Sequence, residues 1–477
     1  MTIKSRYAEY AWLGIALAIG ALVRFWHVTD QSPFLDEAFS LRIGAEPIGQ
    51  LLHDTAALDV QPPGFYLLAH AIFAVAHWPL WQYRLLTAPL GIVTIAATWA
   101  IGRRFGPATA VVAALVIAVL PGMVIWDRLF RMYSLWTALT AVSWWLLIKA
   151  DEASAVRPAF WRYAAYALTA IALPYVHYLG AIPLVSQAVF AAARPASRWP
   201  VFAACAAAAV AFAPWFPIAR EQFAAGATGF ALPPWWDTPF ELFALGTPIA
   251  WTTSAVVPEL IALAFLAAIA FGAFAVRQTA VVYWLGGIVL QAIASALTHK
   301  DLLVARYLFA LAPAMAIAIG ACIQACFARR AAVFAVAGAA ILVTVECVGA
   351  QNVVLDPYYQ FTDWFSVNAT IRAHVAPGDA FVFVQAYPIV VVRSFSAFSG
   401  HALAGPNVPG DVPATLRWIG EQRLRRVWYV ENQPDFADPD FAVRRVLRQQ
   451  RPLVGAWLEP KAYAANSVTI ELYGAAR

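Results

Sequence analysis

Long apolar runs alternate with short polar segments over the first 350 residues of the chain. Most runs are about 20 residues long, which is the length that a helix needs to cross a hydrocarbon core of ~30 Å. Lipid offers no partners to backbone N–H and C=O groups, so a run of this kind must pair them internally as a helix. The pattern therefore predicts a polytopic α-helical membrane protein with about 11 to 13 crossings.

Basic residues orient these runs. Lys4, Arg103 and Arg194 lie in clusters at the ends of runs, and the positive-inside rule places them in the cytoplasm. Eleven crossings then start inside and end outside. The predicted spans cover residues 10–28, 82–102, 107–126, 131–149, 161–175, 177–193, 199–219, 251–276, 279–298, 306–327 and 331–349.

One apolar stretch, Pro62 to Trp78, does not fit this alternation. It is short, it begins with two prolines, and both of its ends must lie outside if the neighbouring spans are correct. We expect a juxtamembrane helix that lies along the outer leaflet. If the stretch does span, residues 161–193 are expected to form one long helix instead.

The pattern changes at Gln351, where charged residues become more frequent. Helix-like and strand-like segments alternate from there on, which predicts a small α/β domain outside the membrane. The helix-like segments are Thr362–His374, Pro413–Arg425 and Phe441–Gln450, and the strand-like segments are Ala380–Gln385, Arg426–Val430 and Ser467–Leu472. We expect a transmembrane domain over 1–350, with an outer loop 29–81 that carries juxtamembrane helices, and a soluble domain over 351–477.

Composition agrees with a membrane protein. The chain is 62% hydrophobic and 12% charged, against about 25% charged in soluble proteins. The formal net charge of +5 comes mostly from loop residues that set topology, so it does not indicate nucleic-acid binding. The four cysteines all lie in apolar runs, which indicates buried packing and neither a disulfide framework nor a metal site.

An acidic pair, Asp36 and Glu37, follows the first apolar run closely, so a short tether holds two carboxylates at the membrane surface. Other polar residues expected on the same side are few. Ionisable groups near the end of a span are costly and are candidates for a functional site. These candidates are Arg84, Arg131, Tyr133, His177, Tyr178, Lys300, Arg306 and Tyr307, together with Asp59, Gln61 and Asp127.

One base and several cations suit glycosyl transfer from a lipid donor. A phosphate that carries a sugar is a good leaving group, so it needs cations and no general acid, whereas the acceptor hydroxyl needs one base. Hydrolysis usually requires a carboxylate on each side of the bond. A transporter or flippase would use the same cations to move anionic headgroups, and would be expected to show internal repeats. A structural assembly subunit would make these polar residues dispensable.

The order of motifs resembles a known family of membrane enzymes. The matching stretches are Arg24, Phe34-Leu35-Asp36-Glu37-Ala38, Asp59-Val60-Gln61-Pro62-Pro63-Gly64-Phe65-Tyr66, Tyr83-Arg84-Leu85-Leu86, Arg131-Met132-Tyr133-Ser134-Leu135, His177-Tyr178 and Ala305-Arg306-Tyr307-Leu308. Over residues 8–350 they resemble the GT-C fold of polyprenyl-phosphate-sugar-dependent glycosyltransferases, in the group of protein O-mannosyltransferases and lipid A aminoarabinose transferases. The resemblance implies a bacterial inner-membrane enzyme with a periplasmic C-terminal domain.

The resemblance also implies roles for single residues. Asp36 would be the base towards a lipid, polysaccharide or protein acceptor, and Glu37 would orient it, bind a metal or cap the following helix. Arg306 and Tyr307 would bind the lipid phosphate, together with Arg84, Arg131, Tyr133, His177, Tyr178 and Lys300 at the donor site. Asp59, Gln61 and Asp127 would lie near the acceptor or support the residues that bind it. Many relatives have His or Lys where this chain has Gln61.

Asp127 would lie near a second acidic position of the fold or cap a helix. Two carboxylates rarely complete a metal site, so no ligand set is predicted. If Mg²⁺ or Mn²⁺ binds, Asp36 and Glu37 are the residues expected to hold it.

Overall fold

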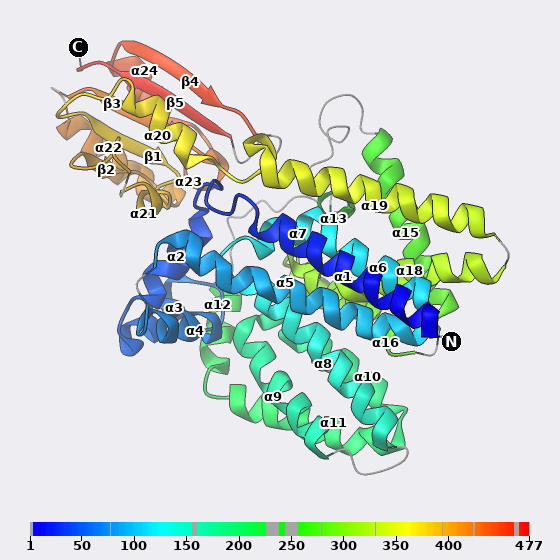
Figure 1. The fold of residues 1–477 in the computed structure, drawn as a ribbon. Helices are drawn as coiled ribbons and strands as arrows, with labels where there is room; N and C mark the ends of the chain where they lie inside the picture. Colours follow the sequence, from blue (N-terminus) through cyan, green and yellow to red (C-terminus); the bar gives the residue numbers. More distant parts are fainter. Residues whose placement is uncertain are drawn as a thin grey trace. The chain divides into compact units, whose positions relative to one another are not determined.

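The computed structural model describes residues 3–76, 78–154, 160–225, 238–243, 256–277, 279–329, 331–393, 395–422, 425–461 and 467–476. Contacts divide the chain into two compact units (Figure 1). The first unit contains the residues up to Val28 and most of residues 43–355. The second contains residues 29–42 and 356–477. The contacts separate the two units after Leu355, and the predicted domain boundary after residue 350 stays a prediction.

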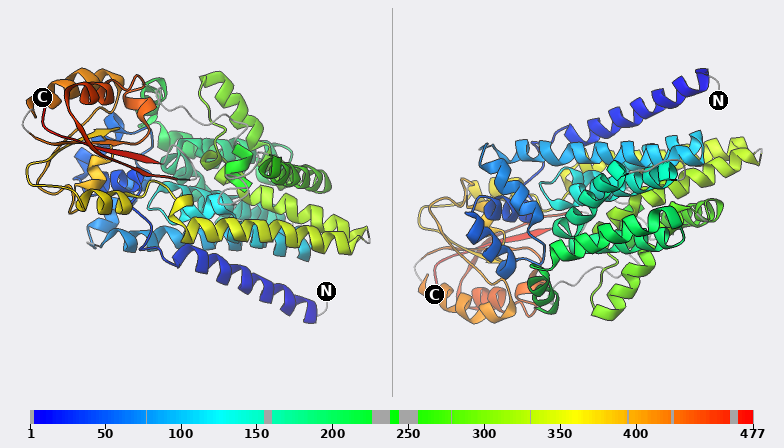
Figure 2. Two further views of the ribbon diagram at one scale, coloured as in Figure 1. Left: turned by 90° about the horizontal axis from the view of Figure 1, so that it is seen from above. Right: turned by 90° about the horizontal axis from the view of Figure 1, so that it is seen from below.

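The first unit is helical, and its long helices run side by side (Figure 2). Its N-terminal part contains α1 (Ile3–Phe25), α3 (Ile48–Leu58), α4 (Gly64–Phe73), α5 (Leu80–Gly102), η1 (Arg103–Phe105), α6 (Pro107–Val119), α7 (Pro121–Asp127) and α8 (Met132–Ser154). Its middle contains α9 (Phe160–Val176), η2 (Tyr178–Gly180), α10 (Ala181–Ala192), α11 (Pro195–Phe212), α12 (Phe216–Ala225) and α13 (Thr238–Phe243). Its last part contains α15 (Val256–Ala275), α16 (Ala280–Leu285), α17 (Gly287–Thr298), η4 (Ala305–Leu311), α18 (Ala312–Ala328) and α19 (Ala332–Leu355).

Five segments of the described chain are long and apolar enough to cross a membrane, or up to seven if each bent helix pair is one span. The five are Tyr7–Phe25, Gln82–Phe105, Ala280–Thr298, Ala305–Ala328 and Ala332–Leu355. The structure thus confirms a polytopic helical membrane protein. The count of eleven stays a prediction, because α8, α9, α10 and α15 are not among these segments. The first residues of the predicted span 251–276 lie outside the described chain.

Two predicted spans are bent in the structure. The span predicted over 107–126 consists of α6 and α7, which meet at an angle of 56°. Pro121 is the first residue of α7, and a proline disfavours a helical conformation of the preceding residue, here Leu120 with ψ 109°. The span predicted over 199–219 breaks between α11 and α12 by 75°.

Small residues allow the helices of the first unit to approach closely. A Cβ added to Gly320 of α18 would lie 2.5 Å from the carbonyl oxygen of Thr109 of α6. A Cβ on Gly272 of α15 would lie 1.7 Å from the carbonyl oxygen of Ala318. Close contact at small residues is the usual means of packing helices in lipid, where the hydrophobic effect does not drive association.

The stretch predicted as a juxtamembrane helix forms α4, which has only 10 residues. At 1.5 Å per residue it is about 15 Å long, roughly half the thickness of the hydrocarbon core. It packs against α9, where a Cβ on Gly64 would lie 2.4 Å from the carbonyl oxygen of Tyr175. Its length supports the prediction that this stretch does not cross the membrane.

The second unit is a small α/β domain, as the sequence predicted. It begins with most of α2 (Leu35–Gly44), and its C-terminal part contains η5 (Pro357–Tyr359), α20 (Trp364–Arg372), β1 (Ala380–Val384), α21 (Ile389–Val392), β2 (Ala402–Ala404), η6 (Pro409–Asp411), α22 (Val412–Glu421), β3 (Val427–Glu431), α23 (Pro434–Ala437), α24 (Ala442–Gln450), β4 (Leu453–Glu459) and β5 (Val468–Tyr473). The sheet order is β2-β1-β3-β5-β4. Strand β1 is parallel to β2 and β3, whereas β5 is antiparallel to β3 and β4.

Every residue of β1 and β3 is buried, because helices cover both faces of this sheet. One face packs on α20 through Phe381, Phe383 and Trp428. The other packs on α22 and α24 through Val382 and Tyr429. Strand β4 was not predicted, and it lies at the edge with alternating exposed residues.

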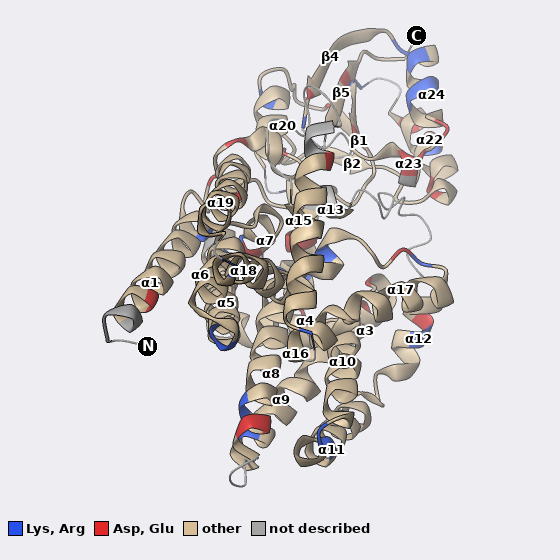
Figure 3. Ribbon diagram, turned by 90° about the vertical axis from the view of Figure 1, so that its right-hand side faces the viewer, with Lys and Arg blue, Asp and Glu red and all other residues tan. Residues whose placement is uncertain are grey.

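Charged residues are sparse on the helices of the first unit and more frequent in the second (Figure 3). The lower end of α8 in this view carries both signs of charge, and α24 carries a row of basic residues. Lys149 and Asp151 belong to this end of α8, where Asp151 pairs with Arg194 at 2.8 Å.

Candidate functional site

The acidic pair lies in the first turn of α2, and its two members differ in environment. Glu37 is fully buried, and its Oε2 accepts a hydrogen bond from the Phe34 N–H at 3.0 Å. The Phe34 carbonyl in turn accepts the first helical hydrogen bonds, so Phe34 is the N-cap residue. A glutamate three residues after the N-cap that bonds back to it is one half of a capping box. This contact gives Glu37 a capping role, and its predicted catalytic role stays a prediction.

Asp36 is only partly buried. The Ser40 hydroxyl donates a hydrogen bond to the backbone carbonyl of Asp36 at 3.0 Å, so this bond involves the main chain of Asp36 and not its side chain. Asp36 also lies in the first turn of α2. Its exposure and position are compatible with the predicted role of a base.

In the first unit, two of the predicted residues, Asp59 and Arg131, come together through Tyr66. The Tyr66 hydroxyl donates a short hydrogen bond to a carboxylate oxygen of Asp59. Arg131 donates from one guanidinium nitrogen to the Tyr66 hydroxyl at 3.0 Å. Tyr66 is 1% exposed and Arg131 is 4% exposed, so the buried phenol of Tyr66 links the Asp59 carboxylate to the Arg131 guanidinium. Tyr66 was part of the recognised motif but was not among the predicted site residues.

His177 lies next to this group, in the connection between α9 and η2. Its ring stacks on Trp136 with centroids 4.3 Å apart, and it contacts the rings of Tyr133 at 5.7 Å and Tyr307 at 5.6 Å. Arg306 lies over the Tyr307 ring at 5.2 Å. The structure thus brings together four more predicted residues: the buried ring of His177, the rings of Tyr133 and Tyr307 that contact it, and Arg306.

The hydrogen bonds of His177 define its tautomer. Nδ1 accepts the backbone N–H of Leu179 at 3.1 Å, so in the neutral ring the proton is on Nε2. Within the described chain, no group accepts a hydrogen bond from Nε2, although His177 is 3% exposed. The charges of Arg131 and Arg306 both act on this ring. A buried donor beside two cations is suited to bind an anion.

Tyr178 and Lys300 contact α12 instead. The Tyr178 hydroxyl donates to Gln222 and accepts from the Trp215 indole N–H at 2.9 Å. Lys300 donates to the Phe223 carbonyl and lies 5.1 Å from the centre of its ring. Burial lowers the pKa of Lys300. Their predicted donor-site role stays a prediction.

Arg84 is 1% exposed, and its guanidinium donates to the carbonyl of Val28 at 2.9 Å, just beyond the end of α1. Arg128, which was not among the predicted site residues, donates to the carbonyls of Val23 at 3.0 Å and Trp26 at 2.6 Å. The last carbonyls of a helix have no partner inside it, and a basic side chain can supply one. These two arginines therefore stabilise the end of the first helix.

Asp127 of α7 forms a buried ion pair with Arg24 of α1, with Nε and Oδ2 2.8 Å apart. Both side chains are almost completely buried. Arg24 also donates to the carbonyls of Ala118 at 2.7 Å and Ile117 at 3.1 Å. A helix cap was one of the roles considered for Asp127, but this pair indicates that it neutralises Arg24. Its predicted place near the acceptor stays a prediction.

Gln61 is 7% exposed, and no described group hydrogen-bonds its Oε1 atom. Glu346 of α19 was not among the predicted site residues. It is fully buried, and its carboxylate oxygens have no hydrogen-bond partner among the described residues. A single acidic residue inside a long apolar run is a signal that could have identified it.

The described residues contain no group of three or more His, Cys, Asp and Glu that could hold a metal ion. Glu37 already uses one carboxylate oxygen for the Phe34 N–H. A divalent cation at Asp36 and Glu37 therefore stays a prediction.

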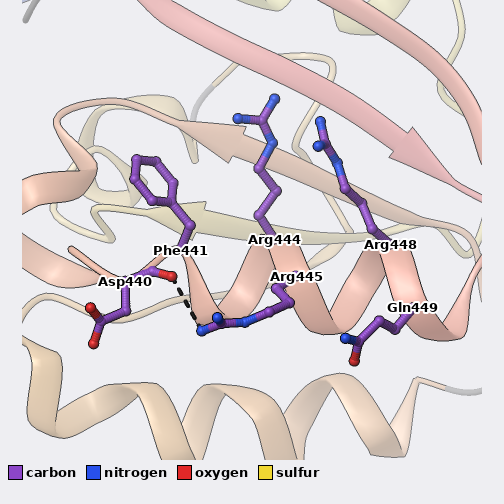
Figure 4. A pocket seen from close by; sticks show the side chains of 6 residues that line it. All are labelled: Asp440, Phe441, Arg444, Arg445, Arg448 and Gln449. Atoms are coloured by element: carbon purple, nitrogen blue, oxygen red, sulfur yellow. Dashed lines mark hydrogen bonds between the residues drawn. The ribbon is translucent and has the colours of Figure 1, made fainter.

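Helix α24 carries a basic hollow of about 510 Å³ (Figure 4). Phe441, Arg444 and Arg448 project from one side of the helix, while Arg445 donates to the backbone oxygen of Asp440. Arg444 and Arg448 also donate to one oxygen of Glu471 at 2.6 and 2.7 Å. These two arginines therefore fasten the helix to strand β5.

The ionisation of Glu471 follows from these bonds. Burial acts to raise its pKa, but hydrogen bonds from Arg444, Tyr473 and Arg448 outweigh burial and lower the pKa below its ordinary 4.5. Asp379 behaves in the same way: burial acts to raise its pKa, but bonds from Arg426, the Ala376 N–H and Trp428 lower it.

Solved structures of two membrane transferases share the fold. The oligosaccharyltransferase AglB from Archaeoglobus fulgidus, solved with an inhibitory peptide and a dolichol-phosphate, matches with a TM-score of 0.54 and 12% identity, over 96% of this chain and 74% of that chain. ArnT from Cupriavidus metallidurans bound to undecaprenyl phosphate matches with a TM-score of 0.51 and 13% identity, over 97% of this chain and 98% of that chain. No protein-family model and no curated protein sequence matches. The chain therefore has the GT-C fold of these membrane transferases, as its motifs predicted.

Proposed function

We propose that this chain is an inverting glycosyltransferase of the membrane that moves a sugar from a polyprenyl-phosphate donor to an acceptor hydroxyl. The two solved relatives contain dolichol-phosphate and undecaprenyl phosphate, which are both phosphorylated polyprenols. We carry this class of ligand over to the present chain. The enzyme would lie in the bacterial inner membrane with its C-terminal domain in the periplasm.

The observation that carries the proposal is the buried Nε2 donor of His177. Within the described chain it has no acceptor, and the charges of Arg131 and Arg306 act on the same ring. A buried donor without an acceptor costs about 1 to 3 kcal/mol, which a bound anion would recover. A lipid phosphate supplies several acceptor oxygens and a negative charge, which suit a buried donor beside two cations.

The chemistry then needs one proton transfer. The acceptor oxygen attacks the anomeric carbon of the donor sugar, and the bond from this carbon to the phosphate oxygen breaks. The phosphate leaves with the electron pair as polyprenyl phosphate, which Arg131, Arg306 and the His177 N–H stabilise. Asp36 accepts the proton of the acceptor hydroxyl. A single displacement of this kind inverts the anomeric centre.

The acceptor is a hydroxyl of a lipid, a polysaccharide or a protein. Tyr133 and Tyr307 would border the phosphate, and Asp59 would orient Arg131 through Tyr66. If a divalent cation takes part at Asp36 and Glu37, dialysis against a chelator will lower the transfer rate and Mg²⁺ or Mn²⁺ will restore it.

Binding of undecaprenyl phosphate to the purified protein in detergent tests the phosphate site. We expect Arg306→Gln and His177→Phe each to weaken binding roughly tenfold, because each removes one donor to a charged group. Arg277→Gln is the matched control, since Arg277 also lies over an aromatic ring, that of Phe274, at 4.7 Å. Unchanged binding in both site variants would remove the basis of the proposal.

Transfer itself is measured by mass spectrometry of polyprenyl-phosphate sugars and modified glycolipids in cells with and without the gene. We expect Asp36→Asn to accumulate the lipid-linked donor and to lose the product at an unchanged protein level. A flippase predicts a different outcome, in which the donor accumulates on the cytoplasmic side and Asp36→Asn has no effect on its consumption.

A further inference from the structure

The acidic segment 29–42 belongs to the same compact unit as the C-terminal residues 356–477, although more than 300 residues separate them in the chain. The sequence assigned this segment to the outer loop of the transmembrane domain. Its contacts group it with the α/β domain, and the predicted domain bounds stay a prediction.

A polar contact fastens the start of the segment to α20. The Ser32 hydroxyl accepts the backbone N–H of Trp364, the first residue of that helix, at 2.8 Å. The next two N–H groups of α20 are accepted by the Asp363 carboxylate at 3.0 and 3.1 Å. The first N–H groups of a helix have no partner inside it, so Ser32 completes the cap that Asp363 begins.

Apolar contacts fasten the first turn of α2. The Phe34 ring stacks on the Phe361 ring with centroids 4.2 Å apart and an angle of 26°. Leu35 and Ala38 pack against the core that contains Trp364. The N-cap residue of α2 and one side of its first turn are therefore held by the C-terminal segment.

The position of Asp36 follows from helix geometry. Successive residues of an α-helix are about 100° apart, so Asp36 projects about 100° from Leu35 and about 160° from Ala38. The side of the helix that carries Asp36 is thus distinct from the side that packs on the core. This agrees with the partial exposure of Asp36 and the packing of Leu35 and Ala38.

We propose that Phe361 and Trp364 are positioning residues that hold the Asp36 carboxylate in place through Phe34 and Ser32. The inference rests on the proposed function of Asp36 as the base. It makes the C-terminal domain part of the catalytic apparatus.

The test compares Phe361→Ala with Phe365→Ala in the full-length protein. Phe365 is the matched control, because its ring contact at 5.8 Å is with Phe395 and not with segment 29–42. We expect Phe361→Ala to lower the transfer rate about tenfold to a hundredfold, since a displacement of about 1 Å can have this effect. Binding of undecaprenyl phosphate is expected to stay unchanged. Phe361→Tyr keeps the stacked ring and should restore the rate.

Hydrogen exchange followed by mass spectrometry gives a readout that does not depend on activity. We expect faster exchange in residues 34–42 of Phe361→Ala, with the sheet as protected as in the wild type and in Phe365→Ala. Wild-type transfer and exchange in Phe361→Ala would overturn the inference, and so would an equal loss of activity in Phe365→Ala. Retained activity in Asp36→Asn would instead overturn the function proposed for Asp36 and leave the exchange result in place.

Discussion

The buried pair of Arg24 and Asp127 offers a quantitative test of how the helices of the first unit are held together. Replacing Asp127 by Asn removes the negative charge but keeps the size of the side chain. Arg24 is 0% exposed and would retain its bonds to the carbonyls of Ala118 and Ile117. Its positive charge would then be buried without the carboxylate that lies 2.8 Å away in the wild type.

Removal of one partner of a buried ion pair costs about 3 to 5 kcal/mol, because the other charge is left uncompensated. A cost of this size lowers the equilibrium constant for folding by a factor of roughly one hundred or more. Replacing both residues by apolar ones of similar size, as in Arg24→Met with Asp127→Leu, is expected to be neutral or stabilising. The double variant should therefore be more stable than Asp127→Asn alone.

The assay is unfolding of the purified protein in detergent micelles by titration with sodium dodecyl sulfate, followed by tryptophan fluorescence. Transfer activity is measured on the same samples. A double variant that regains stability and activity assigns the pair to helix packing alone. If the double variant regains stability but not transfer activity, Asp127 has the additional role near the acceptor. Wild-type stability of Asp127→Asn would refute the reasoning, as would a double variant less stable than the single one.

Three further predictions concern other parts of the chain. Gly91→Ala should destabilise the protein by about 1 to 3 kcal/mol in the same titration, because the new Cβ would lie 2.2 Å from Nε of Arg24 and 2.4 Å from Oδ2 of Asp127. The pKa of Glu471 is lower in the folded state than its ordinary value of 4.5. The ionised Glu471 therefore stabilises the fold above pH 4.5, and this stabilisation is lost as the pH falls through the folded-state pKa. In thermal unfolding, Glu471→Gln should lose less stability on acidification than the wild type. Trp136→Leu removes the ring stacked on His177 at 4.3 Å and should weaken binding of undecaprenyl phosphate, whereas Trp136→Phe should retain most of it, as measured by titration in detergent.

Local patterns in the sequence predicted the elements well. Apolar runs predicted the helices of the first unit, and short buried runs predicted β1, β3 and β5. The two edge strands, β2 and β4, were missed. Strand β2 has only three residues, and Gly455 interrupts the apolar run of β4. The bend between α6 and α7 could have been predicted from Pro121.

The contacts that build the candidate site could not be predicted, because they join residues far apart in the chain. Arg24 and Asp127 are 103 positions apart, and Arg131 and Tyr66 are 65 apart. The sequence identified Arg84, Arg131 and Arg306 as costly near the end of a span, and Arg24 only as part of a motif. It could not say which arginine neutralises an acid and which caps a helix. Arg84 and Arg128 donate to backbone carbonyls at or beyond the end of α1, whereas Arg24 pairs with Asp127.

The bond between Ser32 and Trp364 has a consequence for biosynthesis. Its two residues are 332 positions apart, and a ribosome adds about 5 to 20 residues per second. The acidic segment is therefore made roughly 17 to 66 s before the segment that packs against it. During this interval α2 lacks the aromatic and polar contacts that define its first turn. The carboxylate proposed as the base would therefore be held in place only after residue 364 has been synthesised.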